Sequence, residues 1–153
     1  MSGASFGTPA GAVHICASGE TVTYIGFEKR YVTEEITEVI EMTMTQLDEY
    51  FDGERKEFSV PFTVGGSELQ RRVCDSLMRI PYGETRTYKE IAADAGFPLA
   101  VRAVASAVGK NPISIVIPCH RVIGSDGKMR GYAGGIPFKE YLLEVEGRRP
   151  RKN

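Results

Sequence analysis

Residues 87–108 read Thr-Tyr-Lys-Glu-Ile-Ala-Ala-Asp-Ala-Gly-Phe-Pro-Leu-Ala-Val-Arg-Ala-Val-Ala-Ser-Ala-Val and predict two short helices joined by a tight turn. Thr87 and Glu90 have the spacing of a capping box, in which each side chain binds a free backbone N–H of the other residue. Pro98 suits the first turn of the second helix, which we expect to reach Val108. This pattern is typical of a helix-turn-helix, although helical hairpins also occur in proteins that do not bind DNA.

The second of these helices has one side that is nearly smooth. Its larger apolar residues gather on the other side at helical spacing, which predicts a buried stripe. Small side chains let a helix backbone approach a groove closely, and one long cation extends beyond them. Such a face indicates that the helix docks onto another molecule, with packing against another element of the same protein as the alternative. Its residues are Arg102, Ala103, Ser106 and Ala107.

Charge is divided unevenly along the chain. Residues 1–66 hold 4 Lys and Arg against 11 Asp and Glu, whereas residues 67–153 hold 15 against 9. The resulting net charges of −7 and +6 favour a polyanionic partner for the second half, with ordinary solvation of two surfaces as the alternative. We predict an N-terminal α/β domain at 1–66, a C-terminal domain at 67–147 and a basic tail at 148–153.

The first half carries strand patterns and one helix pattern. Residues 11–17 and 21–27 alternate apolar and polar side chains around a short turn, which predicts a hairpin. Thr33 is the expected N-cap of a helix over 34–51. Residues 58–64 read as a further strand, and the proline within it indicates an edge strand or an irregularity.

The second half is mostly helical. Ser67 and Gln70 have capping-box spacing at the start of a helix that reaches Ile80. Apolar residues recur at helical spacing over 138–145 as well. The chain therefore reads as α+β, with a small N-terminal antiparallel sheet and its helices followed by a mostly helical domain that holds the helix-turn-helix.

The segment Ile-Pro-Cys-His-Arg-Val at 117–122 sets a thiol beside an imidazole and a guanidinium. A cysteine becomes a good nucleophile as a thiolate, when a base or a cation lies nearby. Adjacent side chains of an extended segment point to opposite faces, so a water bridge between Cys119 and His120 is an alternative to direct contact. Free cysteine is also a common packing residue, and these residues alone leave the two interpretations balanced.

Further residues are candidates for a site. The Gly-rich run at 131–135 exposes backbone N–H groups to a ligand or is a simple connector. Asn111 precedes a proline and is a turn former, or it couples the smooth helix to the thiol segment. Glu146 flanks the stripe of the last helix and reaches inward or into solvent. His14 and Cys16 are weak zinc candidates without a second pair, so we expect no metal and no cofactor.

Composition excludes several classes of protein. Three scattered cysteines are too few for a disulfide framework and indicate a reducing compartment. No apolar run approaches the roughly 20 residues that cross a bilayer. The first residues lack the features of a signal peptide. We expect a protein without a membrane partner, cytoplasmic or, in a eukaryotic host, nuclear.

Residues 67–147 resemble the O6-alkylguanine-DNA alkyltransferase family in register, and the stretch 117–122 is similar to its active-site signature. The first 66 residues resemble the family's N-terminal domain only in the order of their elements. The resemblance implies a ribonuclease H-like N-terminal domain and a winged-helix-like C-terminal domain. Further matching stretches lie at 81–90, 102–104, 109–112, 131–135 and 139–147.

The resemblance also implies an activity, that of a methylated-DNA–protein-cysteine S-methyltransferase used once. Cys119 would take an alkyl group from O6-alkylguanine, and from O4-alkylthymine, in double-stranded DNA by a base-flipping mechanism. The thioether product is not cleaved, so the repair is direct, irreversible and stoichiometric. A monomer without a cofactor is expected.

The family's catalytic roles fall on matching residues here. Cys119, His120 and Glu146 would form a relay, through water, that lowers the thiol pKa. Tyr88 would help to protonate the departing guanine, and Asn111 would be the structural hinge residue.

Substrate and DNA contacts are implied in the same way. The carbonyls of Cys119 and Val122 would bind the exocyclic amine of the guanine. Arg102 would fill the gap left by the flipped base, from a helix in the minor groove. The remaining pocket residues would be Tyr132, Ala133 and Gly134, and the remaining DNA contacts would be Thr87, Tyr88, Ala103, Ser106 and Ala107.

Three alternatives stay open. A non-catalytic alkyltransferase-like protein would bind damaged DNA and flag it, but such relatives usually carry Trp in place of Cys119. A helix-turn-helix transcription regulator would need base-reading side chains longer than those of Ala103 and Ser106. A cysteine hydrolase would need an oxyanion and base arrangement that the sequence does not indicate.

Overall fold

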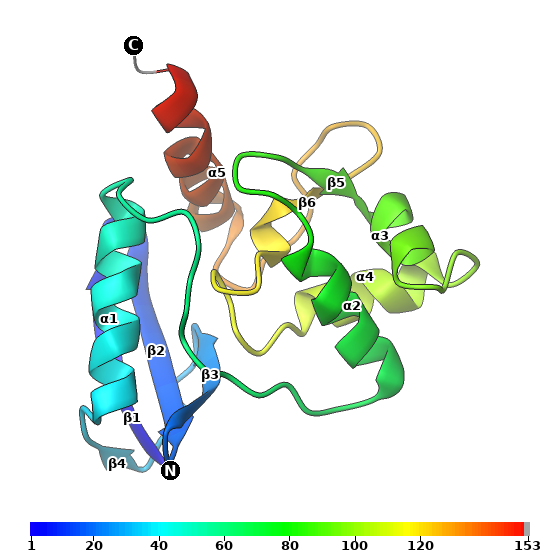
Figure 1. Cartoon of the computed structure of the whole chain (residues 1–153). Coiled ribbons are helices and arrows are strands. Elements are labelled where there is room, and N and C mark those ends of the chain that lie inside the picture. Colours follow the sequence, from blue (N-terminus) through cyan, green and yellow to red (C-terminus); the bar gives the residue numbers. More distant parts are fainter. Residues whose placement is uncertain (152–153) are drawn as a thin grey trace.

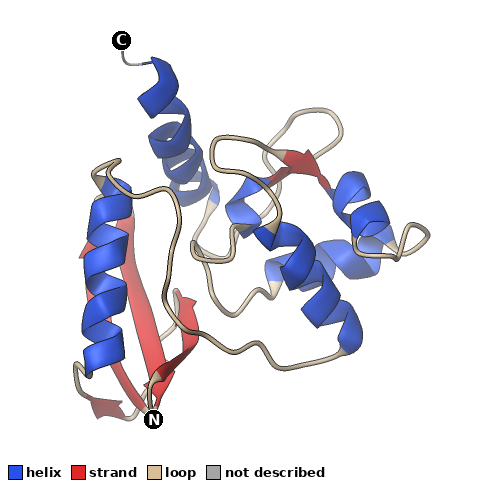
Figure 2. Cartoon of the chain, in the orientation of Figure 1, coloured by secondary structure: helices blue, strands red, loops and turns tan. Residues whose placement is uncertain are grey.

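The computed structural model describes residues 1–151, and of residues 148–151 it describes the backbone alone. Figure 1 shows a sheet with one helix on its face beside a group of shorter helices, and Figure 2 shows that strands dominate the first half and helices the second. The elements are β1 (Ser2–Thr8), β2 (Gly11–Ser18), β3 (Thr21–Gly26), β4 (Thr33–Glu34), α1 (Glu38–Phe51), α2 (Glu68–Met78), β5 (Arg86–Thr87), α3 (Tyr88–Asp94), α4 (Val101–Gly109), the 3₁₀ turn η1 (Cys119–Arg121), β6 (Val122–Ile123) and α5 (Ile136–Arg151).

The N-terminal sheet has four strands in the order β3-β2-β1-β4. β1 and β2 pair antiparallel with Ser2 opposite Ala17, β2 and β3 form the predicted hairpin, and the short β4 runs parallel to β1. Helix α1 packs across β1, β2 and β3 and covers one face of the sheet (Figure 1). Its buried residues Val39, Ile40 and Leu47 supply the contact. The predicted α+β class is confirmed.

Three details of the first half differ from expectation. Thr33 is not a helix cap but part of β4, and α1 begins at Glu38 after Thr37. Residues 58–64 form no strand and make only one bridge, between Val22 and Phe62, because the proline before it has no N–H to extend a ladder. Strand β1 was not predicted, since its small residues have weak strand propensity.

The helix-turn-helix prediction is confirmed by α3 and α4, which pack on each other and on α2. Thr87 and Glu90 make both hydrogen bonds of a capping box at the start of α3. β5, just before α3, pairs with β6 in a short parallel ribbon. The ribbon ties the helix-turn-helix to the end of the thiol segment, because β6 follows η1 directly.

Corrections are needed at the starts of α2 and α4. The Ser67 hydroxyl caps α2 as expected, but the Gln70 amide donates to the carbonyl of Ala107 at 3.0 Å instead of returning to Ser67. Helix α4 begins at Val101, so Pro98 lies in the preceding turn. Ala107 is 4 % exposed against α2, and it therefore does not belong to the smooth outer face of α4.

One hydrophobic core runs through both halves of the chain. Its members include Ile15 and Leu47 from the first half and Leu77, Ile117 and Leu142 from the second. The two predicted units are thus packed together over an apolar interface, which fixes elements of the first half next to the thiol segment. No helix within residues 1–151 is both long and apolar enough to span a membrane.

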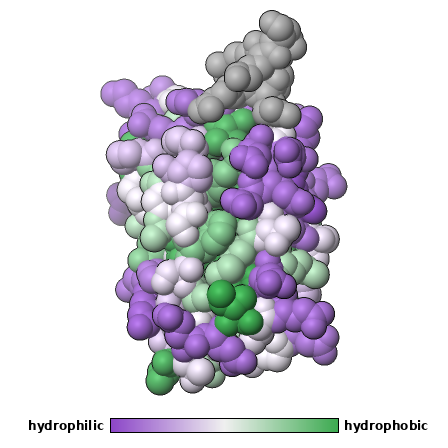
Figure 3. Space-filling model, turned by 90° about the vertical axis from the view of Figure 1, so that its left-hand side faces the viewer, coloured by the Kyte–Doolittle hydropathy of each residue, from purple (hydrophilic) through white to green (hydrophobic). Residues whose placement is uncertain are grey.

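The outer face of the first half differs in character from the helix-turn-helix. Figure 3 shows the side at the left of Figure 1, where α1 and the sheet lie, with hydrophobic residues along its middle and hydrophilic residues on both sides. Glu38, Glu41 and Asp48 of α1 are exposed. This acidic helix offers nothing that attracts a polyanion, so a nucleic acid is expected on the other half.

Candidate active site

Asn111 anchors the segment that carries the thiol. Its side-chain amide donates to the carbonyl of Ile117 at 2.7 Å, and its side-chain oxygen accepts from the N–H of Ile113 at 2.9 Å. The residue is 8 % exposed. Of the two interpretations of Asn111, the structure supports the coupling one, since a single amide joins the end of α4 to both ends of the segment before Cys119.

That segment folds into two tight turns. The N–H of Val116 donates to the carbonyl of Ser114, which closes a three-residue turn around Ile115 with a φ of 73°. Positive φ is unfavourable for a β-branched residue, so strain is held at this turn. The N–H of Cys119 then donates to the carbonyl of Ile117 across Pro118, which gives a second turn of the same size. The thiol thus follows a rigid, doubly folded backbone.

Cys119, His120 and Arg121 form one turn of 3₁₀ helix rather than an extended strand. This corrects the expectation of an extended segment, in which adjacent side chains point to opposite faces. His120 Nε2 lies 2.6 Å from Glu146 Oε2, while Arg121 donates from Nε to Oε1 at 2.8 Å and from Nη2 to Oε2 at 3.0 Å. Neighbouring side chains therefore converge on one carboxylate of α5.

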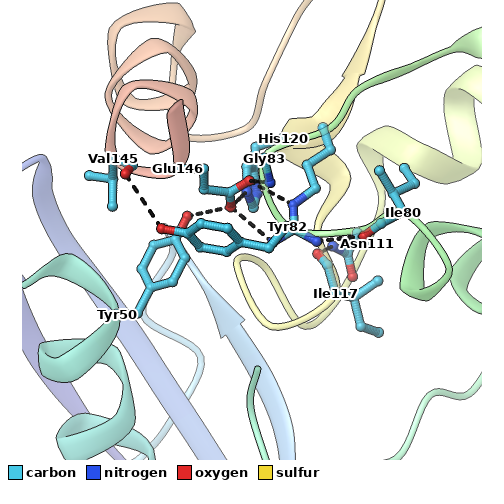
Figure 4. A network of polar contacts seen from close by, with 10 residues as sticks. Tyr50, Ile80, Tyr82, Gly83, Asn111, Ile117, His120, Val145 and Glu146 are labelled. Atoms are coloured by element: carbon cyan, nitrogen blue, oxygen red, sulfur yellow. Dashed lines mark hydrogen bonds and ion pairs between the residues drawn. The ribbon is translucent and has the colours of Figure 1, made fainter. Parts of the chain in front are cut away.

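Glu146 is 1 % exposed and accepts hydrogen bonds from four residues of three segments. Besides His120 and Arg121, the hydroxyl of Tyr50 donates to Oε2 at 2.6 Å and the N–H of Gly83 to Oε1 at 3.2 Å. Figure 4 shows Tyr50 reaching the carboxylate from α1, on the opposite side from Asn111 and Ile117. The inward interpretation of Glu146 is the one that the structure supports.

The charges in this network follow from its contacts. Burial opposes the ionisation of Glu146, but hydrogen bonds and charges from His120 and Arg121 outweigh it and lower the carboxyl pKa to about 2. Burial lowers the pKa of His120 despite the Glu146 contact, so the ring is neutral at neutral pH. A neutral ring that donates from Nε2 to Glu146 leaves Nδ1 as an acceptor. His120 Nδ1 is buried without a hydrogen-bond partner among the described residues.

Cys119 is 7 % exposed and its thiol is the resting form. Burial raises its pKa to about 11, against the lowering effects of the Asn111 amide and the Lys139 ammonium. A thiol in this form needs a base close by to become a thiolate.

Tyr88, Tyr132 and Lys139 are among the titratable side chains that interact electrostatically with Cys119. Tyr88, at the first position of α3, has its pKa raised chiefly by burial. The Tyr132 hydroxyl is buried, and burial and the nearby Cys119 raise its pKa well above its usual value against an opposing effect of Ser114. Lys139 is 1 % exposed, donates to the Arg130 carbonyl at 3.3 Å, and has its pKa lowered by burial.

The Gly-rich run packs against an aromatic wall. The ring of Phe27 meets the rings of Tyr132 and Phe138 edge-on, at centroid distances of 5.5 and 5.0 Å. A Cβ at Gly134 would lie 2.6 Å from Phe27, so only glycine fits there. A cavity of about 500 Å³ opens beside this wall, with Asn111 and the exposed Ala133 in its lining. Val122, at the start of β6, is fully buried next to the site.

The predicted DNA contacts lie at the start of α3 and on the outer face of α4. Thr87 and Tyr88 begin α3, and Arg102, Ala103 and Ser106 are exposed on α4. Tyr88 is half-buried and interacts electrostatically with Cys119.

Sequence reasoning missed Arg121, Tyr50 and Lys139. Lys139 carried a usable signal, because it lies seven residues before Glu146 and so on the same face of α5. Arg121 was seen but not assigned, since the 3₁₀ turn that aims it was not foreseen. Tyr50 gave no local signal, as its partner is 96 residues away.

Two family models match the two halves of the chain. One is described as the ribonuclease-like domain of 6-O-methylguanine DNA methyltransferase and matches residues 4–64. The other is the DNA binding domain of the same family and matches residues 68–148. Together they cover nearly the whole chain.

Individual relatives and solved structures belong to the same family as these models. A methylated-DNA–protein-cysteine methyltransferase of Methanosarcina acetivorans is 44 % identical over 94 % of this chain and 97 % of its own length. One from Mycolicibacterium paratuberculosis is 56 % identical over 67 % of this chain and 62 % of its own. The crystal structure of Mycobacterium tuberculosis OGT in complex with DNA superposes with a TM-score of 0.90 at 40 % identity, over 97 % of this chain and 94 % of that one. The chain belongs to the 6-O-methylguanine DNA methyltransferase family.

Proposed function

We propose that this protein repairs DNA by moving the alkyl group of O6-alkylguanine, and of O4-alkylthymine, onto Cys119. The observation that carries the proposal is the buried Nδ1 of His120, which has no hydrogen-bond partner among the described residues while Nε2 is held by Glu146 at 2.6 Å. A base fixed in one tautomer directly after a buried thiol is the arrangement that activates a nucleophile during reaction.

The transfer is a single displacement. The Cys119 thiol gives its proton to His120 Nδ1 through a water molecule, and the sulfur attacks the alkyl carbon. The carbon–O6 bond breaks, its electron pair stays with the guanine, and Tyr88 supplies the proton that neutralises the leaving base. Glu146, held anionic by Arg121, stabilises the imidazolium that forms. A thioether is not cleaved under these conditions, so each molecule acts once.

The damaged base must leave the duplex to reach a buried thiol. Extrusion costs a few kcal/mol, and a side chain that enters the vacated space offsets part of this. Arg102 is the exposed cation on the smooth face of α4, beside Ala103 and Ser106. Binding by a small helix face and by phosphate contacts is tolerant of sequence, as a repair protein that searches all DNA requires.

The pocket for the flipped base lies between the thiol segment and the Gly-rich run. Tyr132 lines it beside the alkyl group, and the N–H of Ala133 contacts O6. Gly134 keeps the run against Phe27, and the carbonyls of Cys119 and Val122 receive the exocyclic amine. The raised pKa of Tyr132 keeps its phenol neutral next to the thiol, so it adds no negative charge where a thiolate forms.

Mass spectrometry tests the proposal directly. The protein is mixed with a duplex that contains one O6-methylguanine, and we expect a gain of one methyl group that peptide mapping places on Cys119. Cys119→Ala is the control and should remain unmodified, while Cys16 and Cys74 report non-specific alkylation. An unchanged mass with DNA binding retained would instead support the damage-binding alternative, which none of the relatives' names favours.

We further infer that the protein acts as a monomer without a membrane partner, in the cytoplasm or in the nucleus of a eukaryotic host. One thiol, one relay and one DNA-facing helix are supplied by the same chain. Light scattering during gel filtration, with and without DNA, tests the monomer: a stable dimer in the absence of DNA would contradict it.

A further inference from the structure

We propose that Tyr50 is a positioning residue for the transfer, whose hydroxyl holds Glu146 Oε2 and limits that oxygen's attraction for the His120 proton. The inference rests on the proposed function for its catalytic meaning. Its structural part stands on the contacts alone. It makes the first half of the chain a working part of the thiol relay rather than a scaffold.

Geometry fixes the Tyr50 hydroxyl on the same oxygen that His120 uses. Tyr50 OH and His120 Nε2 each lie 2.6 Å from Glu146 Oε2. The Tyr50 side chain is fully buried, and its ring packs at 5.5 Å from Phe58 and edge-on at 6.3 Å from Tyr82. The ring therefore has no freedom to turn the hydroxyl elsewhere, and the contact is a constant feature of the folded protein.

The hydroxyl can only donate to Glu146. Burial and the nearby carboxylate raise the Tyr50 pKa well above its usual value, so the phenol keeps its proton. A donor on an anionic oxygen spreads the negative charge and weakens the bonds that the oxygen accepts from others. Tyr50 thus competes with His120 Nε2 for the same charge.

Every charged or titratable neighbour of His120 enters this balance. Glu146 favours the imidazolium, while Arg121 and Lys139 oppose it, and burial opposes it most. Among these neighbours Glu146 favours a charged His120, and Tyr50 acts on Glu146. Removing its hydroxyl leaves Oε2 with His120 and Arg121, and the imidazolium becomes more stable. The expected direction is a higher His120 pKa.

Nuclear magnetic resonance can follow this without any activity assay, because the chain has 2 histidines, His14 and His120. Ring resonances are titrated in the unmodified protein and in Tyr50→Phe, and we expect the His120 midpoint to rise by about 1 unit. Tyr31→Phe is the matched control. Its hydroxyl bonds Ser5 at 2.9 Å and lies 3.5 Å from His14 Nδ1, so it should shift only the His14 resonances.

A second variant keeps the ring and hydroxyl in place. Site-specific replacement of Tyr50 by 3-fluorotyrosine makes the phenol a stronger donor, so the His120 midpoint should fall. Opposite shifts in the two variants are the signature of a hydrogen bond, since a loss of packing would not change sign. A His120 midpoint that is the same in both variants and in the unmodified protein overturns the inference.

Transfer kinetics then connect the contact to the reaction. The acid limb of the rate of Cys119 alkylation by free O6-benzylguanine should move with the His120 midpoint, upward in Tyr50→Phe and unchanged in Tyr31→Phe. If the acid limb of the alkylation rate stays in place while the His120 midpoint moves, Tyr50 has no role in the transfer. If the unmodified protein shows no alkylation at all, the proposed function fails, and the resonance titration still decides the Tyr50 contact.

Discussion

Arg121 and Glu146 form a two-pronged ion pair inside the protein, with hydrogen bonds of 2.8 and 3.0 Å. Arg121 also donates from Nη1 to the Ile80 carbonyl at 2.7 Å, so each of its three guanidinium nitrogens donates a hydrogen bond. The pair keeps Glu146 ionised at any physiological pH. The relay therefore starts from an anionic carboxylate and a neutral His120, so the thiol proton is the only one that it has to accept.

Arg121→Met should strongly destabilise the fold. The substitution leaves the Glu146 carboxylate buried without its main counter-charge, and breaking a buried pair on one side typically costs about 3–5 kcal/mol. Denaturant unfolding measures the loss. Arg79→Met is the control, because the Arg79–Asp94 pair is about half exposed on both sides and is worth no more than about 1 kcal/mol. Equal losses in the two variants would contradict the buried role.

Stability should fall in alkaline solution because of Cys119. Its folded pKa of about 11 lies above the ordinary 9.0, so the folded state keeps a proton that the unfolded state has lost. This stabilisation of the folded state, on the order of 3 kcal/mol, is complete below the unfolded pKa of Cys119 and is lost as pH rises toward about 11. Cys119→Ala lacks this loss, so the stability difference between the two proteins should change with pH only in the alkaline range. A constant difference would contradict the raised pKa.

Lys139→Met should separate stability from activity. The ammonium is buried and faces Cys119, so an apolar side chain of similar length removes a desolvated charge without opening a cavity. We expect equal or greater stability and roughly tenfold slower alkylation by free O6-benzylguanine, since the developing thiolate loses a positive neighbour. Lys128→Met, in an exposed loop, is the control and should change neither. Unchanged kinetics in Lys139→Met would show that its charge does not reach the sulfur.

Arg102→Ala should affect DNA and free base differently. Without a side chain to fill the vacated stack, repair of O6-methylguanine in a duplex should slow much more than transfer from free O6-benzylguanine. Arg55→Ala, which removes a cation from the acidic half, controls for a general change in charge. Equal losses with both substrates would rule out the wedge role of Arg102.

Local features of the sequence were the ones that could be predicted. The capping box of Thr87 and Glu90 and the stripe of α4 depend only on residues a turn apart, and both are present. Ala107 was misassigned because it lies at the edge of the stripe, where its exposure depends on Gln70 of another helix. The start of α1 was misplaced because Thr33 has a better partner in β1 than in a helix.

The site was predicted as a set of residues but not as a geometry. Cys119, His120 and Glu146 were identified through the resemblance, whereas the turn that aims His120 and Arg121 depends on a strained φ at Ile115 that no residue pattern announces. The Tyr50 contact depends on the packing of the two halves, which brings together positions 96 residues apart. Such contacts follow from the shared core and not from any one segment.

Because Glu146 follows Cys119 by 27 positions on the last helix, the relay has an order of assembly during synthesis. Tyr50 and then the thiol leave the ribosome before the carboxylate that unites them. A nascent chain that ends before α5 holds a cysteine with no base aimed at it, and it cannot spend its only turnover before the fold is complete. The relay is thus complete only once α5 has packed against the thiol segment.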